Sequence, residues 1–218
     1  MNELLPLLLQ GTVVTIKITA LAALLATALA LLAALGKLSP WWPLRWMANI
    51  YIEVFRGSSL LVQLFWLYFV LPLPPFNAKL APYTVAVLGL GLNLGAYGAE
   101  VMRGAFSAVP RGQIEAAIAL NIPPVKRFVG IVLPQALLVA LPPFTNLLIE
   151  LLKGTALVSL ITLADLAFRA DQLVQATFRT EEIFLMTLFI YFLLAQAIHL
   201  SMRMLERRLN RGLPQGKA

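Results

Sequence analysis

The sequence predicts an all-α polytopic membrane protein with five transmembrane helices, and two observations carry that prediction. The first is composition: 60% of the 218 residues are hydrophobic and 12% are charged, with a mean hydropathy of +0.84, which is too apolar for a water-soluble domain. The second is pattern. The apolar residues form continuous runs close to the roughly 20 residues that a helix needs to cross the hydrocarbon, and they do not alternate as barrel strands do.

Five continuous apolar runs are the candidate spans. They cover residues 12–35, 58–73, 83–102, 133–152 and 183–205. We expect the whole chain, 1–218, to form a single transmembrane domain. Two connecting segments are long enough to carry structure of their own, one at about 111–124 and the other at about 156–182.

The placement of lysine and arginine predicts the orientation of the chain, because cytoplasmic loops retain these residues. Twelve of the 17 basic residues fall between the first and second spans, between the third and fourth, or near the C-terminal end of the chain. They are Lys37, Arg45, Arg56, Arg103, Arg111, Lys126, Arg127, Arg203, Arg207, Arg208, Arg211 and Lys217. This predicts a periplasmic N-terminus, a cytoplasmic C-terminus, a cytoplasmic 111–124 segment and a periplasmic 156–182 segment. Topology then explains the formal net charge of +7 without a nucleic-acid partner.

The sequence offers no metal or nucleotide chemistry of its own. Cysteine is absent and histidine occurs once, so we expect no disulfide and no metal site. The phosphate-binding pattern G-x-x-x-x-G-K-[ST] is also absent, so any ATP must be hydrolysed by another chain. We therefore expect no catalytic residue and no cofactor bound by this chain.

The approach to the second run has two local features. Residues 39–46 combine two prolines, three tryptophans and a basic residue, the mix expected where a chain runs along a membrane surface. Ser58 or Ser59 can then cap the second helix.

The outer segment contains an amphipathic stretch at 164–178. Leu166, Leu173 and Phe178 are its large apolar residues, set among charged neighbours. This stretch either receives a soluble partner or packs on the bundle as a lid.

The segment 111–124 is predicted to hold a short helix on the cytoplasmic side. Residues 113–120 are rich in alanine, Asn121 suits a left-handed stop, and two prolines follow that prevent continuation. A helix of barely three turns does not stabilise itself in water and must pack on something. Its alanines leave a slim surface that suits insertion into a groove of a partner. The alternative is an ordinary connecting helix folded against the inner face of the bundle.

Polar residues inside the spans are candidate functional residues, because they are costly in hydrocarbon. Asn93 lies near the middle of the third span, where it either meets a substrate or hydrogen-bonds another helix. In the fourth span, Glu150 is four residues after Asn146 and three before Lys153, so the charged pair either faces a substrate or closes on itself. Gly154 follows and is expected to loosen the helix and free backbone groups.

A second acid–base pair at the same spacing, Glu100 and Arg103, lies near the inner end of the third span, and we expect it to be a structural latch. The chemistry offered by Asn93, Glu150 and Lys153 suits a small zwitterion. Since no acidic cluster stands out in the spans, a neutral or amino-acid-derived substrate is favoured over a cationic one.

The loop and the spans around it resemble a known family. One set of residues matches the EAA motif of the inner-membrane permease subunits of ATP-binding-cassette (ABC) importers, specifically the polar amino acid branch that includes histidine, glutamine and arginine permeases. It consists of Glu115, Ala116, Ala117, Leu120, Phe128, Ile131, Leu133, Pro134, Gln135, Ala136, Leu141, Pro142 and Asn146. Further matches to the same branch are Phe55, Arg56, Gly57, Leu60, Leu61, Val62, Gln63, Ala96, Tyr97, Glu100, Arg103, Gly104, Leu151, Leu152, Lys153, Thr155 and Leu157.

The resemblance implies a type I importer fold, in which two permeases, identical or paralogous, form the translocation pathway in the bacterial inner membrane. Two ATPase subunits, which hold ATP and Mg, would grip the short helix from the cytoplasm, and a periplasmic binding protein would deliver the substrate. The residues implied to couple to the ATPase are Gln113, Glu115, Ala116, Ala117, Leu120 and Asn121. The residues expected to line the substrate pathway are Asn93, Asn146, Leu147, Glu150, Lys153, Gly154, Thr155 and Ser159.

The chain departs from the family pattern in three positions. Asn121 stands where the family usually has glycine, and asparagine is the next most tolerant of left-handed geometry. Ala156 stands where a serine is usual, and Ser59 where proline is common.

Two other functional classes remain as alternatives. An ion-coupled secondary carrier shares the intramembrane acid and amide but does not need an EAA loop. An intramembrane serine protease would require Ser58 and His199 to meet inside the bilayer.

Overall fold

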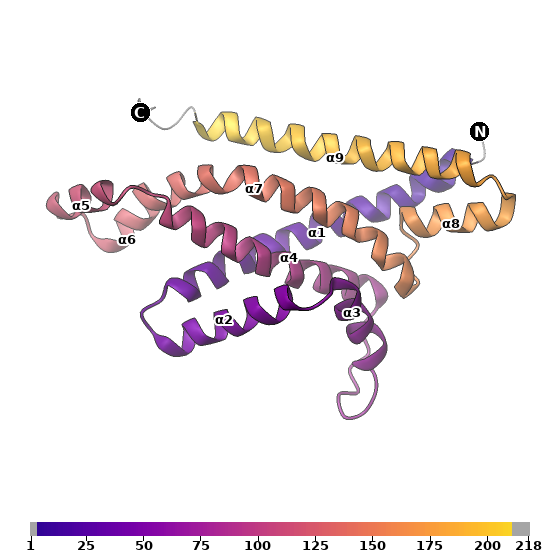
Figure 1. Cartoon of the computed structure of the whole chain (residues 1–218), viewed down its shortest axis with the longest axis horizontal. Helices are drawn as coiled ribbons and strands as arrows, with labels where there is room; N and C mark the ends of the chain where they lie inside the picture. Colours follow the sequence, from indigo (N-terminus) through magenta and orange to yellow (C-terminus); the bar gives the residue numbers. More distant parts are fainter. Residues whose placement is uncertain (1–3, 211–218) are drawn as a thin grey trace.

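The computed structural model describes residues 4–210, and within that range every regular element is a helix. Four long helices lie side by side along the long axis of the molecule (Figure 1). They are α1 (Leu4–Leu38), α4 (Pro82–Ser107), α7 (Leu133–Gly154) and α9 (Thr180–Asn210). The all-α prediction is confirmed, and Arg211 and Lys217, which entered the orientation argument, lie outside the described residues.

The fourth span is a composite of four consecutive helical pieces. They are α6 (Pro124–Arg127), the π-helix η2 (Phe128–Val132), α7 and the 3-10 helix η3 (Thr155–Ile161). Together with α1, α4 and α9, this stretch gives four helical segments long and apolar enough to cross a membrane. A fifth is reached only when a bent pair of helices is counted as one span.

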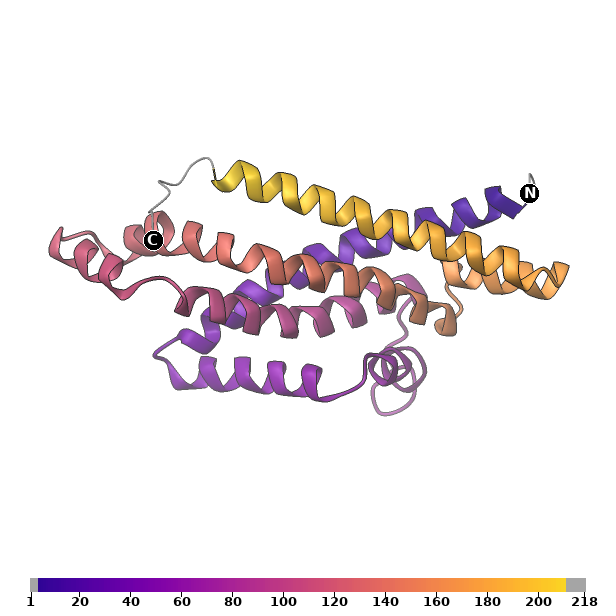
Figure 2. The same cartoon turned by 45° about the horizontal axis from the view of Figure 1, so that its top comes forward.

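That bent pair replaces the straight second span expected at 58–73. The chain forms α2 (Trp42–Gly57), breaks, and continues as α3 (Leu60–Phe65) and the π-helix η1 (Trp66–Val70) at an angle of 104°. Eleven residues at 1.5 Å each span about 16 Å, roughly half the hydrocarbon thickness, so α3 and η1 do not cross alone. The residues from Trp42 onward, expected along a membrane surface, form the start of a helix that packs beside α1 and α4 (Figure 2).

The bend comes from two extended residues, Ser58 and Ser59. The predicted capping by these serines is wrong, because neither side chain caps α3 and the Ser58 hydroxyl donates instead to the carbonyl of Val54 at 2.6 Å. The bend also relocates Arg56. It stands near the far end of α2, about 20 Å from the α1–α2 turn at helical rise, and so away from Lys37 and Arg45 near that turn.

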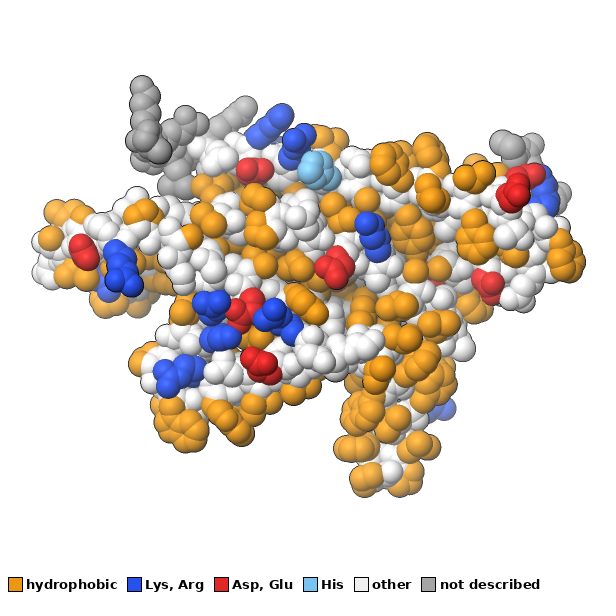
Figure 3. All heavy atoms as spheres, in the orientation of Figure 1, with side chains coloured by type: hydrophobic (Ala, Val, Ile, Leu, Met, Phe, Trp, Pro, Cys, Tyr) orange, Lys and Arg blue, Asp and Glu red, His pale blue; other side chains and the backbone are white. Residues whose placement is uncertain are grey.

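Past the bend, α3 and η1 project from the body as an arm covered with apolar side chains (Figure 3). Trp66, Phe69 and Phe76 on this arm and the following loop are exposed by 41%, 52% and 54%. In water such a surface would be unstable, so the arm requires lipid or another protein around it.

The centre of the fold is the contact between α1 and α4. Gly91, Gly95 and Gly98 allow it, because a Cβ on each would lie 2.7–2.9 Å from side-chain atoms of α1. Close approach through small residues is the usual way in which membrane helices pack. Buried residues make up 61% of the most apolar window of α4 but only 11% of that of α9, so α4 is the most enclosed of the candidate spans and α9 leaves most of its surface uncovered.

The segment expected at 156–182 contains α8 (Leu166–Thr177), which packs on α1 and α9 as a lid. Asp165 caps it, accepting from the Phe168 N–H at 3.0 Å, and the Leu166 N–H donates to Thr15 of α1 at 3.1 Å. Leu166 and Leu173 are buried, as the lid alternative requires. Phe178 adopts φ 57° after the last helical turn, and its side chain is 87% exposed.

Candidate functional site

A short helix stands at one end of the molecule, beyond the ends of the spans (Figure 1). It is α5 (Arg111–Ala119), which confirms the helix expected over 113–120. Asn121 is left-handed at φ 56°, its N–H donates to Ile118 at 2.8 Å, and the Ile122 N–H donates to Ala117 at 3.0 Å. These two bonds form the glycine-type helix stop that asparagine was expected to provide.

The surface of α5 divides into an inward and an outward side. Ala117 is 2% exposed, so it contacts this chain and is not free for a partner. The side chains that face outward are Gln113, Glu115, Ala116, Ile118, Leu120 and Asn121. Ile118 and Leu120 are 56% and 75% exposed and form an apolar patch at the tip of the molecule. Ile118 was not predicted as a functional residue from the sequence.

One contact ties α5 to the spans. Gln135 at the start of α7 donates to Gln113 at 2.5 Å and to its own helix at Ile131 at 2.9 Å. A side-chain amide thus links α5 to α7 in addition to the backbone.

In the middle of the bundle, an amide network holds the α2–α3 bend against α4. Asn93 Nδ2 donates to the Phe55 carbonyl at 3.0 Å and to Gln63 Oε1 at 3.1 Å. Gln63 Nε2 donates in turn to the same Phe55 carbonyl at 3.0 Å and to Ser58 Oγ at 2.8 Å. The helix-to-helix role left open for Asn93 is thus observed, and Gln63 is its partner.

A cavity of about 260 Å³ opens beside this network, between α3, α4, α7 and η3. It brings together four of the eight residues expected on a substrate pathway: Asn93, Glu150, Lys153 and Gly154. The remaining lining residues are Leu60, Leu90, Leu94, Tyr97, Leu151 and Leu157. Leucines carry little sequence signal in a chain this apolar, so pattern alone did not distinguish these five from the core.

Glu150 and Lys153 are both exposed and do not form the ion pair that their spacing permits. Within residues 4–210, ion pairs join Lys37 and Arg103 to Glu100, and Arg179 to Glu182. The two charges on α7 are therefore available to a ligand, to water or to another chain.

The other four expected residues lie outside this cavity. Asn146 is exposed one turn before Glu150, and Leu147 packs against the core. Thr155 is fully buried and donates to the Leu152 carbonyl at 2.7 Å, while Ser159 donates to Ala156 at 2.7 Å. At Gly154 the α-helix ends and continues as 3-10 helix, and the freeing of backbone groups expected there stays a prediction.

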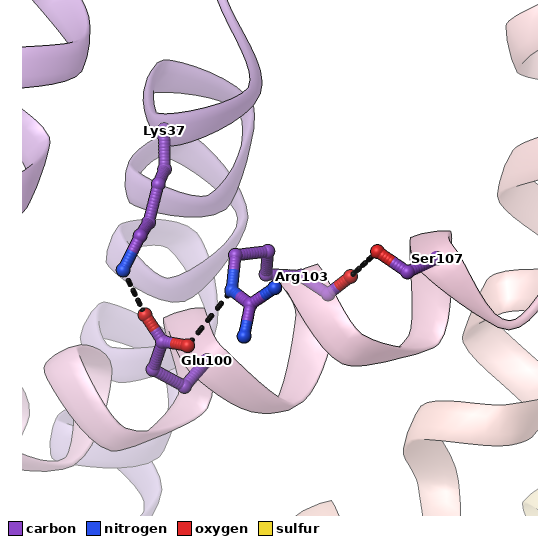
Figure 4. A network of polar contacts seen from close by, with 4 residues as sticks. All are labelled: Lys37, Glu100, Arg103 and Ser107. Atoms are coloured by element: carbon purple, nitrogen blue, oxygen red, sulfur yellow. Dashed lines mark hydrogen bonds and ion pairs between the residues drawn. The ribbon is translucent and has the colours of Figure 1, made fainter.

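Nearer the end that carries α5, Glu100 of α4 accepts from two cations (Figure 4). Lys37 Nζ of α1 lies 2.5 Å from Oε1 and Arg103 Nε lies 2.8 Å from Oε2. The structural latch expected of Glu100 and Arg103 is confirmed, and Lys37 is a third member that helical spacing did not reveal.

A larger hollow of about 750 Å³ lies on the other side of α7, against α9. Lys153 lines both cavities, and His199 lines only the larger one. Ser58 is at the α2–α3 bend, where its hydroxyl is engaged with Val54 and Gln63. No hydrogen bond joins Ser58 to His199 in the described part of the chain, and the dyad of a serine protease is not formed.

On the face shown in Figure 3, charged side chains gather between α2 and α4 and along α7. Exposed charges are not tolerated by hydrocarbon. The areas that carry them therefore meet water or protein.

Comparison with known proteins agrees with this architecture. The family described as "Binding-protein-dependent transport system inner membrane component" matches residues 26–211. The "Probable amino-acid ABC transporter permease protein y4tF" of Sinorhizobium fredii (strain NBRC 101917 / NGR234) is 42% identical, over 93% of this chain and 87% of its own. The "L-cystine transport system permease protein TcyB" of Bacillus subtilis (strain 168) is 38% identical, over 94% and 88%.

Solved structures show the same fold. A protein described as "Crystal structure of an amino acid ABC transporter with histidines" has a TM-score of 0.86 at 36% identity, covering 95% of this chain and 96% of that one. The MetNI methionine ABC transporter, in an inward-facing form, has a TM-score of 0.79 at 17% identity, a likeness of fold alone. The chain belongs to the binding-protein-dependent transport system inner membrane components, and it is a multi-pass inner-membrane permease subunit of an ABC importer.

Proposed function

We propose that this permease transports an amino acid or an amino-acid-derived solute, and that the 260 Å³ cavity is a binding site on the translocation pathway. The observation that carries the proposal is the unpaired placement of Glu150 and Lys153 in one cavity with Asn93. An α-amino acid carries an ammonium and a carboxylate, which a carboxylate and a lysine can bind by charge-assisted hydrogen bonds. The names of the relatives, which include amino-acid, L-cystine and glutamine permeases, support the same class.

Energy would come from a separate ATPase subunit, which holds ATP and Mg and docks on α5. The exposed apolar patch of Ile118 and Leu120, beside Glu115 and Ala116, supports this role, since a helix of nine residues is not stable in water without a partner. A second permease, identical or paralogous, would cover the charged face along α7, and a periplasmic binding protein would deliver the substrate.

The arrangement of the ends supports the predicted topology. The α5 helix, the α1–α2 turn and the last turns of α9 lie at one end, while α8 and the start of α1 lie at the other (Figure 1). We infer that the α5 end is cytoplasmic and the α8 end periplasmic. Because the chain has no cysteine, single cysteines introduced at Arg111 and Asp171 test this directly: an outside reagent that labels Arg111→Cys and spares Asp171→Cys contradicts it.

The decisive experiment is transport in proteoliposomes that contain the permease, its ATPase and its binding protein. Uptake should require both ATP and the ATPase subunit, and uptake driven by an ion gradient without ATPase would contradict the proposal.

Coupling through α5 is tested with Glu115→Lys and Ala116→Asp. Both residues are exposed, whereas a substitution at the buried Ala117 would disturb the fold of the loop itself. We expect each variant to abolish substrate-stimulated ATP hydrolysis in assembled complexes, because a charge on the outward side of α5 opposes docking. Arg45→Gln, an exposed change on α2, is the matched control and should retain hydrolysis.

A further inference from the structure

We propose that the cavity selects α-amino acids with an uncharged aliphatic side chain, and that Gly154 limits the length of that side chain. The proposal rests on the proposed function, since it names the substrate class of the same site. Two observations support it: the hydrogen-bonding groups of the cavity that have no partner in this chain, and the apolar side chains that line the rest of the cavity.

The orientation of the Asn93 amide is fixed by its neighbours. Nδ2 faces the Phe55 carbonyl at 3.0 Å, and a carbonyl can only accept, so the nitrogen cannot be exchanged with the oxygen. Its second hydrogen goes to Gln63 Oε1 at 3.1 Å, and the Gln63 orientation is fixed by the same carbonyl. Both donors of Asn93 are thus used, and what it can offer the cavity is an acceptor.

The cavity therefore provides two acceptors, from Asn93 and Glu150, and one cationic donor, Lys153. Two acceptors suit the ammonium of an α-amino acid, and the lysine suits its carboxylate. These groups satisfy the main-chain part of the ligand and leave no charged side chain among the lining residues for a second charge.

The rest of the lining is apolar. It consists of the five leucines at 60, 90, 94, 151 and 157 and the ring of Tyr97, whose hydroxyl donates to the Arg56 carbonyl at 3.4 Å. The Arg56 guanidinium lies 5.3 Å from the centre of that ring and is not a lining group. A charged ligand side chain would be desolvated against leucine without a partner, which is costly, whereas an aliphatic one gains by burial.

Gly154 limits how far a ligand side chain can extend into the apolar part of the cavity. A Cβ there would lie 3.4 Å from Leu90 Cδ2 and 3.5 Å from Leu60 Cδ2, which is ordinary contact, and its φ of −63° is normal for any residue. Alanine would thus fit without strain and would occupy space that now belongs to the cavity. Its effect should fall on long ligand side chains and spare short ones.

The test is equilibrium binding of radiolabelled L-leucine, L-alanine, L-lysine and L-glutamate to the purified permease–ATPase complex without binding protein. We expect leucine to bind at least about tenfold more tightly than lysine or glutamate. In Gly154→Ala, leucine affinity should fall about tenfold and alanine affinity less than about threefold, in line with the discrimination that one methyl group gives in an apolar pocket.

A second variant inverts the preference. Leu157→Asp places a carboxylate among the leucines and should raise lysine affinity about tenfold or more, while the matched Leu157→Asn should not. Lysine or glutamate binding as tightly as leucine in the unmodified protein overturns the proposal. An equal loss of leucine and alanine in Gly154→Ala overturns it as well, and so does an absence of binding by all four probes in a complex that transports leucine. In each of these cases ATP-dependent transport would persist, which separates them from failure of the proposed function.

Discussion

Two helices of this permease carry the same acid–base pattern and use it in opposite ways. In α4, Glu100 is followed three residues later by Arg103, and the two lie 2.8 Å apart. In α7, Glu150 is followed three residues later by Lys153, and no ion pair forms. The spacing is identical, so the spacing does not decide the outcome.

The surroundings explain the difference. Glu100 lies where α1 and α4 are in close contact, its side chain is only 19% exposed, and Lys37 reaches it from α1. The attraction of two cations to this partly buried carboxylate offsets the free energy lost when water is removed from it and the side chains are held in place. Glu150 and Lys153 are exposed along the cavities, where an isolated pair gains little from closing. Paired charges in this protein hold helices together, and unpaired ones at the same spacing remain available to a ligand.

The largest expected effect is at the paired site. Glu100→Gln leaves Lys37 and Arg103 facing each other without their shared carboxylate, so we expect the complex to lose about 2 kcal/mol of stability. This is below the roughly 3–5 kcal/mol of a fully buried broken pair, because the two cations are partly exposed. Thermal unfolding of the detergent-purified complex measures it.

Glu53→Gln is the matched control for that change. Glu53 is exposed on α2 and forms no ion pair among residues 4–210, so its substitution should leave the unfolding temperature unchanged. If Glu100→Gln were as stable as this control, the latch would contribute nothing and the contrast between α4 and α7 would fail.

Asp165 extends the comparison to a carboxylate that is buried without a cation. One of its oxygens caps α8, the other has no partner, and burial raises its pKa from 3.8 to about 6. Because the folded state binds the proton more tightly than the unfolded state, the contribution of Asp165 to stability is most favourable below pH 4 and is lost as the pH rises through about 6. Asp165→Asn retains a capping oxygen and removes the charge.

We therefore expect Asp165→Asn to unfold a few degrees higher than the unmodified complex at pH 7.5, with the difference vanishing near pH 4. The exposed Asp171 on the same helix provides the control, since Asp171→Asn should shift unfolding equally little at both pH values. A stability difference for Asp165→Asn that is constant from pH 4 to pH 7.5 would show that its ionisation is not the cause.

The same contrast marks what the sequence could and could not predict. Hydropathy located the long helices, and the chemistry of Asn121 predicted its left-handed turn, because both depend on local properties of the chain. The bend after Gly57 was missed, since two serines in extended conformation look like a helix start and a run of apolar residues does not reveal its direction.

The sequence also did not predict contacts between residues that lie far apart along the chain. Helical spacing proposed Arg103 for Glu100 correctly but not Lys37, which is 63 residues away on α1. It left open whether Lys153 pairs with Glu150, which it does not, and it gave no sign that Gln63 would fix the Asn93 amide. Such partners depend on which helices pack together, and that is settled by the fit of small residues such as Gly98 against α1, not by local pattern.

The smallest expected effect is the one that tests the contrast most directly. A double-mutant cycle with Glu150→Gln and Lys153→Met should give a coupling free energy for unfolding below about 0.5 kcal/mol, the level of additive sites. The corresponding cycle with Lys37→Met and Glu100→Gln should give about 1 kcal/mol, because those side chains are in contact at 2.5 Å. Both cycles are measured by thermal unfolding of the same complex.

Transport should depend on the Glu150 and Lys153 pair of α7, whereas stability should depend on the Glu100 pair of α4. Glu150→Gln removes the charge-assisted hydrogen bond that we propose for the ligand ammonium, worth about 1.5–3 kcal/mol, so uptake should fall about tenfold or more while stability is retained. The charge-swapped Glu150→Lys with Lys153→Glu should not recover uptake, because a ligand, unlike an internal partner, does not exchange its ends in a cavity lined asymmetrically by Asn93 and the leucines. Recovery by the swap, or a coupling equal to that of Lys37 and Glu100, would mean that the α7 charges pair in the assembled importer.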